Sequence, residues 1–312
     1  MKKFMKGCAI TAVILIVLGA ALACVAGTTR SSAVISDVVE SVTGGRVHLH
    51  LGSRWGDNWG FFVDDWDMDM SDFYNNAYEI FEGNVADYSL DSEVSSLNIE
   101  LGGYEFDTEV SPDGLFHLEA EGVGKVQCYV KNGVLNVKAV RSSIKLNNPS
   151  GSIVLYIPEG QYFEKVDIEL GAGMMALNDV TAGDVSLEVG AGQVQAANLQ
   201  AEQLKASVGA GEIDLDSMNI DVLDVEVGMG ELKGSGSVNK SADIECAMGN
   251  IELKLAGSRQ DFNYRLELAA GNLDLGKDSY SGLAQERRID NDADKNMEIE
   301  CSMGNVTIRF EE

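Results

Sequence analysis

Apolar and polar residues alternate with a period of two from Leu97 onward, the pattern of strands that bury one side. Asn132-Gly133 separates two such runs, and this dipeptide favours the tight turn of a β-hairpin. No segment of this region shows a convincing helical period. The pattern predicts an all-β domain, and residues 95–165 supply its leading strands in the segments LNIELGGYEFDTEV, LFHLEA, KVQCYVKNGVLNVKAV and GSIVLYIP.

Residues 166–312 repeat one unit, which consists of a strand, a Gly-x-Gly bend and a second strand. Four copies align without gaps at a period of 19, a fifth stays in register, and two more follow at longer spacings. A short period of this kind is typical of architectures in which each unit buries its apolar side against its neighbours. The seven copies are VDIELGAGMMAL, VSLEVGAGQVQA, LKASVGAGEIDL, LDVEVGMGELKG, ADIECAMGNIEL, YRLELAAGNLDL and MEIECSMGNVTI. Their glycines are Gly171, Gly173, Gly190, Gly192, Gly209, Gly211, Gly228, Gly230, Gly249, Gly271 and Gly304.

The repeats favour a β-solenoid-like stack, in which each coil takes about 19 residues. A stack of antiparallel β-hairpins is the alternative, and the sequence leaves both open. The middle residue of each bend is apolar, where a two-residue hairpin would carry Asn-Gly, and this favours a bend. In the second copy the inward side chains are expected to be Val185, Leu187, Val189, Val194, Ala196 and Leu199.

The N-terminus predicts a membrane anchor in residues 1–30. Lys2, Lys3 and Lys6 precede an uncharged apolar stretch, residues 7–29, which is long enough as a helix to cross a bilayer. Because these lysines lie before the stretch, the N-terminus is expected in the cytoplasm and the rest of the chain outside. A cleaved signal peptide or a lipoprotein at Cys24 is the rival interpretation, and both keep the chain outside the cytoplasm.

Residues 31–94 differ from the rest, since they contain all 3 Trp residues and many Asp without sustained alternation. We interpret this stretch as an acidic-aromatic juxtamembrane spacer, with a short helix expected around residues 72–81. A docking segment for a partner is the alternative.

Charge narrows the choice of partners. The chain carries 50 Asp and Glu against 23 Lys and Arg, and its first 30 residues contain no acidic group. The exported part is therefore strongly anionic and should repel nucleic acid and anionic lipid. We expect a cationic protein or polymer as the partner.

A column of outward carboxylates is expected along the repeats. In a parallel stack these groups lie about 4.8 Å apart, so like-charge repulsion favours cations, and calcium is the natural cation for oxygen ligands outside the cell. Lys205 and Arg265 interrupt the flanking row. A plain solvated acidic face is the alternative to calcium sites at Glu169, Glu188, Glu226, Glu245, Glu267 and Glu300.

Cysteine and histidine give little support for other sites. Cys246 and Cys301 occupy a core position, and sequential stacking would put the copy with Leu268 between them, near 10 Å apart and beyond disulfide reach. His48 and His50 share one side of a short segment, and with His117 they are the 3 histidines of the chain. We interpret the cysteines as small core residues and expect no metal site at the histidines.

The first repeat contains G-x-G-x-x-A, as a dinucleotide-binding turn does, but a strand rather than a helix follows it. The GSGS segment at 234–237 lacks the frame of a hydrolase nucleophile and is expected to be a turn. We therefore expect neither a cofactor nor catalysis.

The chain resembles the DUF4097 family of bacterial proteins, whose members carry the label adhesin. The resemblance rests on the N-terminal membrane segment, on IVLYIPEG with Ile157-Pro158, and on the repeats such as ECAMGNIEL and ECSMGNVTI, and it covers residues 95–312. It implies a solenoid-like repeat domain displayed outside a Gram-positive-type cell, and it implies no activity.

These observations favour a membrane-anchored, non-catalytic, adhesin-like interaction module. An accessory or sensor of a cell-envelope stress response is the first alternative, although the short N-terminal tail leaves little for a cytoplasmic partner to bind. A hydrolase of cell-wall polymer is the second alternative, and the lack of one distinctive carboxylate pair weighs against it.

Overall fold

The computed structural model describes residues 47–50, 62–66, 80–90, 93–140 and 151–311. The described residues from 80 to 140 and from 151 to 311 belong to one compact unit, and residues 47–50 and 62–66 belong to another. In the smaller unit, β1 (Val47–His50) and β2 (Phe62–Trp66) form an antiparallel pair. The anchor in residues 1–30 and most of the spacer lie outside the described residues, and the described part contains no helix with the length and hydropathy of a membrane span.

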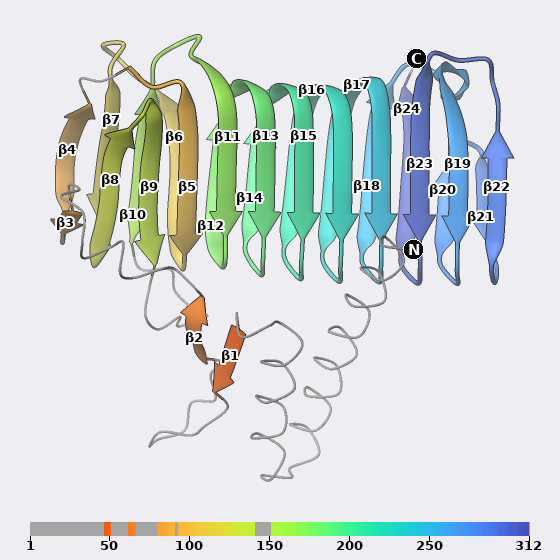
Figure 1. The fold of residues 1–312 in the computed structure, drawn as a ribbon, viewed down its shortest axis with the longest axis horizontal. Coiled ribbons are helices and arrows are strands. Elements are labelled where there is room, and N and C mark those ends of the chain that lie inside the picture. The colour runs from red at the N-terminus through yellow and green to blue at the C-terminus, as the bar shows by residue number, and fades with distance from the viewer. Residues whose placement is uncertain (1–46, 51–61, 67–79, 91–92, 141–150, 312) are drawn as a thin grey trace. The chain divides into compact units, whose positions relative to one another are not determined.

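The larger unit begins with eight strands that build its first coils (Figure 1). The turn between β8 and β9 contains Asn132 and Gly133, both at positive φ, and the two strands pair antiparallel, which confirms the predicted hairpin. Ile80 and Phe81 lie in a strand, so the helix expected around residues 72–81 is wrong at its end, and residues 72–79 lie outside the described part. The strands are β3 (Ile80–Glu82), β4 (Val85–Leu90), β5 (Ser96–Gly102), β6 (Tyr104–Val110), β7 (Phe116–Glu121), β8 (Lys125–Lys131), β9 (Val134–Val140) and β10 (Ser152–Ile157).

The repeats supply the remaining strands, and each copy begins in one row of strands and ends in a second row. Two strands of 16 residues, β16 and β17, each run from the second row of one coil into the first row of the next. The GSGS segment lies inside β17 and is not a turn. The strands are β11 (Tyr162–Leu170), β12 (Gly173–Asn178), β13 (Thr181–Val189), β14 (Gln193–Ala197), β15 (Gln200–Val208), β16 (Glu212–Val227), β17 (Glu231–Cys246), β18 (Asn250–Ala256), β19 (Phe262–Leu268), β20 (Asn272–Leu275), β21 (Asp278–Ser281), β22 (Gln285–Ile289), β23 (Lys295–Cys301) and β24 (Asn305–Glu311), with a 3-10 turn at Arg259–Asp261 between β18 and β19.

The copies stack as parallel coils and not as hairpins. Val166 pairs with Val185 and Val185 with Leu204, so equivalent positions 19 residues apart are direct neighbours. Strands β5 and β6 form an earlier coil of the same kind, because Leu101 pairs with Leu170 and Tyr104 with Gly173. The solenoid interpretation is therefore confirmed for the described repeats.

The core lies between the two rows of strands, and the alternation of the sequence determines which side chains fill it. All six inward residues expected in the second copy, from Val185 to Leu199, are buried to 3% exposure or less. Burying one such side chain contributes about 1.5–3 kcal/mol, and each coil repeats this contribution. The stack therefore gains stability coil by coil.

The last two copies stack in the reverse of their sequence order. Strand β23 of the seventh copy pairs with β17 of the fifth on one side and with β19 of the sixth on the other. Strand β24 lies between β18 and β20 in the same way. The sixth copy is therefore the outer coil, and the sequential stacking assumed from the sequence is wrong here.

The segment between the sixth and seventh copies explains this order. It forms β21 and β22, which pair antiparallel with β20 and β19 and cover the outer edge of the sheet. After β22 the chain returns, and its next strand, β23, pairs with β17. Since an uncovered sheet edge is a template for aggregation, the antiparallel cap protects that end.

Candidate functional site

The outward carboxylates form a column on the first row of strands, which Ser207 interrupts at one position. Register pairing places them in the spatial order Glu100, Glu169, Glu188, Ser207, Glu226, Glu245, Glu300, Glu267 and Glu286. The column predicted from the repeats is therefore present, and Glu100 and Glu286 extend it beyond the predicted members. Lys138 closes one end, because its Nζ lies 2.6 Å from Oε1 of Glu100.

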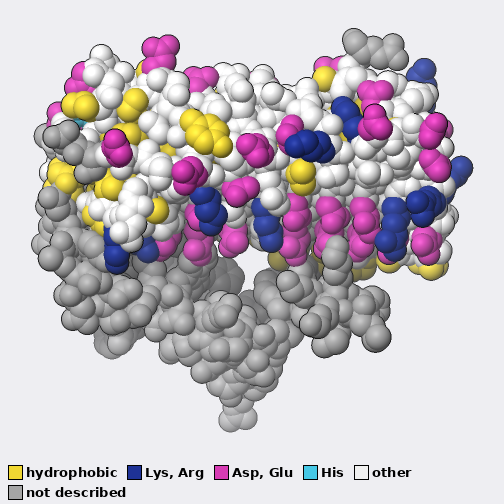
Figure 2. Space-filling view, turned by 45° about the horizontal axis from the view of Figure 1, so that its top comes forward, with side chains coloured by type: hydrophobic (Ala, Val, Ile, Leu, Met, Phe, Trp, Pro, Cys, Tyr) yellow, Lys and Arg dark blue, Asp and Glu magenta, His cyan; other side chains and the backbone are white. Residues whose placement is uncertain are grey.

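The column is most acidic where β16, β17 and β23 lie side by side. Each of these strands presents two outward carboxylates, and all six side chains are half-buried. Figure 2 shows a band of acidic side chains on this face that basic groups interrupt on both sides. We call this set the acidic block, and it consists of Asp224, Glu226, Asp243, Glu245, Glu298 and Glu300.

The acidic block depends on the order of the coils. If the copies stacked in sequence order, Arg265 of the sixth copy would lie between Asp243 and Glu298. In the observed order Arg265 lies outside Glu298, and Lys205 borders the block at Asp224 on the other side. The reversal therefore removes a cation from the middle of the row.

Three carboxylates at the outer side of the column approach one another closely enough to share a cation. Ligand oxygens of Glu267, Glu298 and Glu300 lie within 4.8 Å of one another. The guanidinium of Arg265 already contacts two of them, at 2.5 Å from Glu267 and 3.3 Å from Glu298. A guanidinium thus offsets part of the negative charge of this cluster, and the calcium sites expected along the column stay a prediction.

Crowding changes the acidity of one column member. Burial, followed by the neighbouring carboxylates Glu100 and Glu188, raises the pKa of Glu169, and Lys138 partly offsets this. A like charge about 4.8 Å away costs on the order of 1 kcal/mol even at the dielectric constant of water. Glu169 therefore binds a proton more readily than an isolated carboxylate would.

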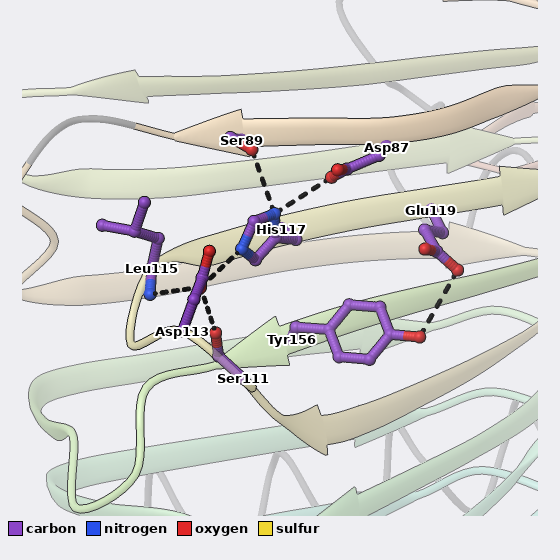
Figure 3. A network of polar contacts seen from close by, with 8 residues as sticks. All are labelled: Asp87, Ser89, Ser111, Asp113, Leu115, His117, Glu119 and Tyr156. Atoms are coloured by element: carbon purple, nitrogen blue, oxygen red, sulfur yellow. Dashed lines mark hydrogen bonds and ion pairs between the residues drawn. The ribbon is translucent and has the colours of Figure 1, made fainter.

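A second polar cluster surrounds His117 on β7 (Figure 3). Its Nε2 lies 2.8 Å from Asp113, and its Nδ1 lies 3.0 Å from both Asp87 and the hydroxyl of Ser89. The ring also meets Tyr156 of β10 edge-on, at 6.4 Å between centroids. The cluster joins β4, β7 and the turn before β7.

Ser89, His117 and Asp113 are the residue types of a hydrolase triad, but their arrangement does not suit a general base. Hydrogen bonds to Asp113 and then Asp87 raise the pKa of His117 and favour the imidazolium. A protonated ring has no lone pair with which to accept the proton of Ser89. We therefore assign the cluster a structural role in fastening the leading strands.

This cluster should make stability depend on pH. The raised pKa of His117 means that its stabilisation is complete below the ordinary value of 6.5 and is lost as pH rises through the folded-state pKa. The pKa of Asp113 is lowered to about 2, mainly by His117, so its contribution is lost only as pH falls from 3.8 toward that value. The cluster therefore stabilises the fold most between pH 3.8 and pH 6.5.

We expect His117→Gln to remove this dependence. Between pH 6 and pH 9 the unfolding free energy of the wild type should fall by about 1 kcal/mol more than that of the variant, a modest amount because both partner carboxylates are exposed. Urea denaturation at several pH values measures the difference. Parallel curves for the two proteins would show that the histidine carries no such charge.

Cys246 and Cys301 lie in adjacent strands as direct register partners, which corrects their expected separation. The reason is the reversed order of the last two coils. Both thiols are free and buried, and each contacts the carbonyl of a repeat glycine, Cys246 at 3.3 Å from Gly249 and Cys301 at 3.2 Å from Gly304. A hydrogen bond with the Cys301 side chain, together with burial, raises the pKa of Cys246, so this thiol stays protonated.

The sequence analysis did not predict the His117 cluster. For the other two histidines it predicted only that they share one side of a short segment. His48 and His50 lie in β1 of the smaller unit. The spacing of Asp113 and His117 was a local signal, since residues four apart across a short turn can meet. Asp87 comes from a strand 30 residues earlier and gave no such signal.

Comparison with known proteins finds several similar solved structures and one family. Solved structures similar to this chain include a "putative adhesin" of Bacteroides fragilis, at 14% identity, with 74% of this chain and 97% of that one covered and a TM-score of 0.39. A "putative lipid binding protein" of Parabacteroides distasonis follows at 16% identity, with 74% and 96% covered and a TM-score of 0.38. A "putative cell adhesion protein" of Clostridium sporogenes shares 11% identity, with 75% and 100% covered and a TM-score of 0.34.

No curated protein matches the chain in sequence. The family described as Toastrack DUF4097 matches residues 117–309, which include His117, the carboxylate column from Glu169 onward and all seven repeats. This match covers more than half of the chain and agrees with the all-β stack of parallel coils. The chain belongs to the DUF4097 family.

Proposed function

We propose that this protein is a membrane-anchored, extracytoplasmic, non-catalytic interaction module that binds a cationic partner on the acidic block. The observation that carries this proposal is the register of β16, β17 and β23, which stacks six carboxylates in two columns over three strands. The apolar segment of residues 7–29 and the lysines before it support the location.

The arrangement suits a basic polymer or peptide better than a single ion. Neighbouring carboxylates on adjacent strands lie about 4.8 Å apart, so several ammonium or guanidinium groups can each lie between two of them. The protein itself uses this geometry, because Arg265 bridges Glu267 and Glu298. On the second row, Lys233 bridges Glu212 and Glu231 at 3.0 Å each. Guanidinium and ammonium groups therefore both fit between carboxylates of adjacent strands.

The binding of a cationic peptide tests this proposed function directly. We expect the full chain to bind a ten-residue lysine peptide, and the triple variant Glu226→Gln, Glu245→Gln, Glu300→Gln to bind it about tenfold more weakly. The dissociation constant at several salt concentrations is the readout, because ion pairing also predicts weaker binding as salt rises.

A matched control removes the same charge elsewhere. Glu121, Glu159 and Glu202 are exposed and lie outside the column, so changing all three to Gln reduces the negative charge of the chain by the same amount. This control should bind the peptide nearly as well as the wild type. Equal weakening in both triple variants would show that only total charge matters and would overturn the acidic block as the site.

A further inference from the structure

The reversed coil order also brings three methionines together. The middle residues of the glycine bends follow one another in space as Ala172, Ala191, Ala210, Met229, Met248, Met303 and Ala270, as the backbone hydrogen bonds between adjacent bends show. The amide of Met248 donates to Gly228 at 2.8 Å, and that of Met303 donates to Ala247 at 2.7 Å. In sequence order, Ala270 would separate the second methionine from the third. We call Met229, Met248 and Met303 the methionine triad.

The bend position does not require methionine for packing. Four of the seven bends carry Ala at this position, among them the adjacent bends at Ala210 and Ala270. Met303 is 49% exposed, and Met229 and Met248 are half-buried. The thioethers therefore lie at the surface, where a ligand can reach them.

A shallow groove follows these bends. Its volume is about 760 Å³, and its lining includes Met229 and Met248 together with the polar side chains of Glu231, Asn250 and Asn305. Met303 does not line the groove and lies in the next bend beyond Met248. The carboxylate of Glu231 pairs with Lys233 at 3.0 Å and accepts a hydrogen bond from Asn250 at 2.8 Å. The groove thus combines soft sulfur donors with polar side chains.

We propose that the methionine triad binds Cu(I) through three thioether sulfurs. Thioethers are soft, uncharged ligands that select Cu(I) over hard cations such as calcium. Metal–sulfur bonds of about 2.3 Å place the sulfurs of a trigonal site about 4 Å apart. Met248 lies one strand, about 4.8 Å, from each of Met229 and Met303, and these two lie two strands, about 9.6 Å, apart. The flexible side chains of Met229 and Met303 would therefore turn toward Met248 to bring the three sulfurs together.

The neighbouring thiols do not belong to this site. Cys246 and Cys301 each precede a triad methionine by two residues, but their side chains point into the core and are 2% and 1% exposed. Thioethers also need no deprotonation before they bind a metal. Binding at the triad should therefore change little between pH 6 and pH 8.

Silver(I) is the probe, because it resembles Cu(I) in softness and does not change oxidation state under these conditions. Titration of the full chain, labelled with ¹³C at the methionine methyl groups, follows each thioether separately by nuclear magnetic resonance. We expect one equivalent of silver to shift the methyl signals of Met229, Met248 and Met303. Met174, which is 45% exposed and lies in strand β12, should not shift.

Leucine variants complete the test, since leucine keeps the volume of methionine and removes its sulfur. We expect Met248→Leu to weaken silver binding by at least about tenfold, and Met174→Leu to leave it unchanged. Competition with a Cu(I) chelator should give the same ranking for Cu(I). Unshifted triad methyl signals in excess silver, or equal affinity in both variants, would overturn the proposal.

Discussion

Gly211→Ala is expected to lower the free energy of unfolding by about 3 kcal/mol, whereas Gly209→Ala should cost less than about 1 kcal/mol. A Cβ on Gly211 would lie 2.2 Å from the carbonyl oxygen of Gly192 and 2.8 Å from a methyl group of Val189. A Cβ on Gly209 would meet its nearest atom, the oxygen of Gly190, at 3.0 Å. The second glycine of the bend is therefore required by sterics, and the first is not.

The repeats themselves agree with this difference. The second glycine is present in all seven copies, while the first is replaced by Ala247, Ala269 and Ser302 in the last three. Chemical denaturation of the two single variants gives the comparison, and each serves as the control for the other. Equal losses would mean that the bends can relax and that the spacing between coils is not fixed at the second glycine.

Much of the fold follows from the sequence because each coil uses local rules. Alternation fixes which side chains point inward, and the period of 19 fixes the register, so Val189 and Val208 are neighbours as expected. The coil of β5 and β6 was harder to recognise, because Tyr104 lies where the repeats have their second glycine. The local pattern therefore predicts the repeated coils better than it predicts the earlier coil that β5 and β6 form.

The order of the last two coils could not be predicted from the same rules. The fifth, sixth and seventh copies present the same kind of surface to their neighbours, so either copy can pack against β17 and β18. What decides the order is the path of the connections, and the only signal was the departure from the period of 19 after Gly249. Both the acidic block and the methionine triad depend on this choice.

The His117 cluster shows a different limit. Its partners come from β4, from β10 and from the turn before β7, and only the register of three antiparallel strands brings them together. A histidine with several aspartates nearby in sequence is common in an acidic chain. Sequence reasoning therefore had no reason to select Asp87 as the partner.

The reversed coil order can be tested by disulfide trapping on the second row of strands. Glu252 is the direct register partner of Thr307, and Thr307 is the partner of Asp274 on its other side. Adjacent partners lie about 4.8 Å apart, within the range that a disulfide spans, whereas two strands of separation give about 9.6 Å, beyond it. These positions lie outside the acidic block and away from the buried thiols.

Two double variants of the full chain carry the test, Glu252→Cys with Thr307→Cys and Glu252→Cys with Asp274→Cys. After mild oxidation, mass mapping under non-reducing conditions should find the disulfide between positions 252 and 307 in nearly all molecules of the first variant. It should find almost none between positions 252 and 274 in the second. The opposite result, with 252 joined to 274 and not to 307, would show sequential stacking and would contradict the account.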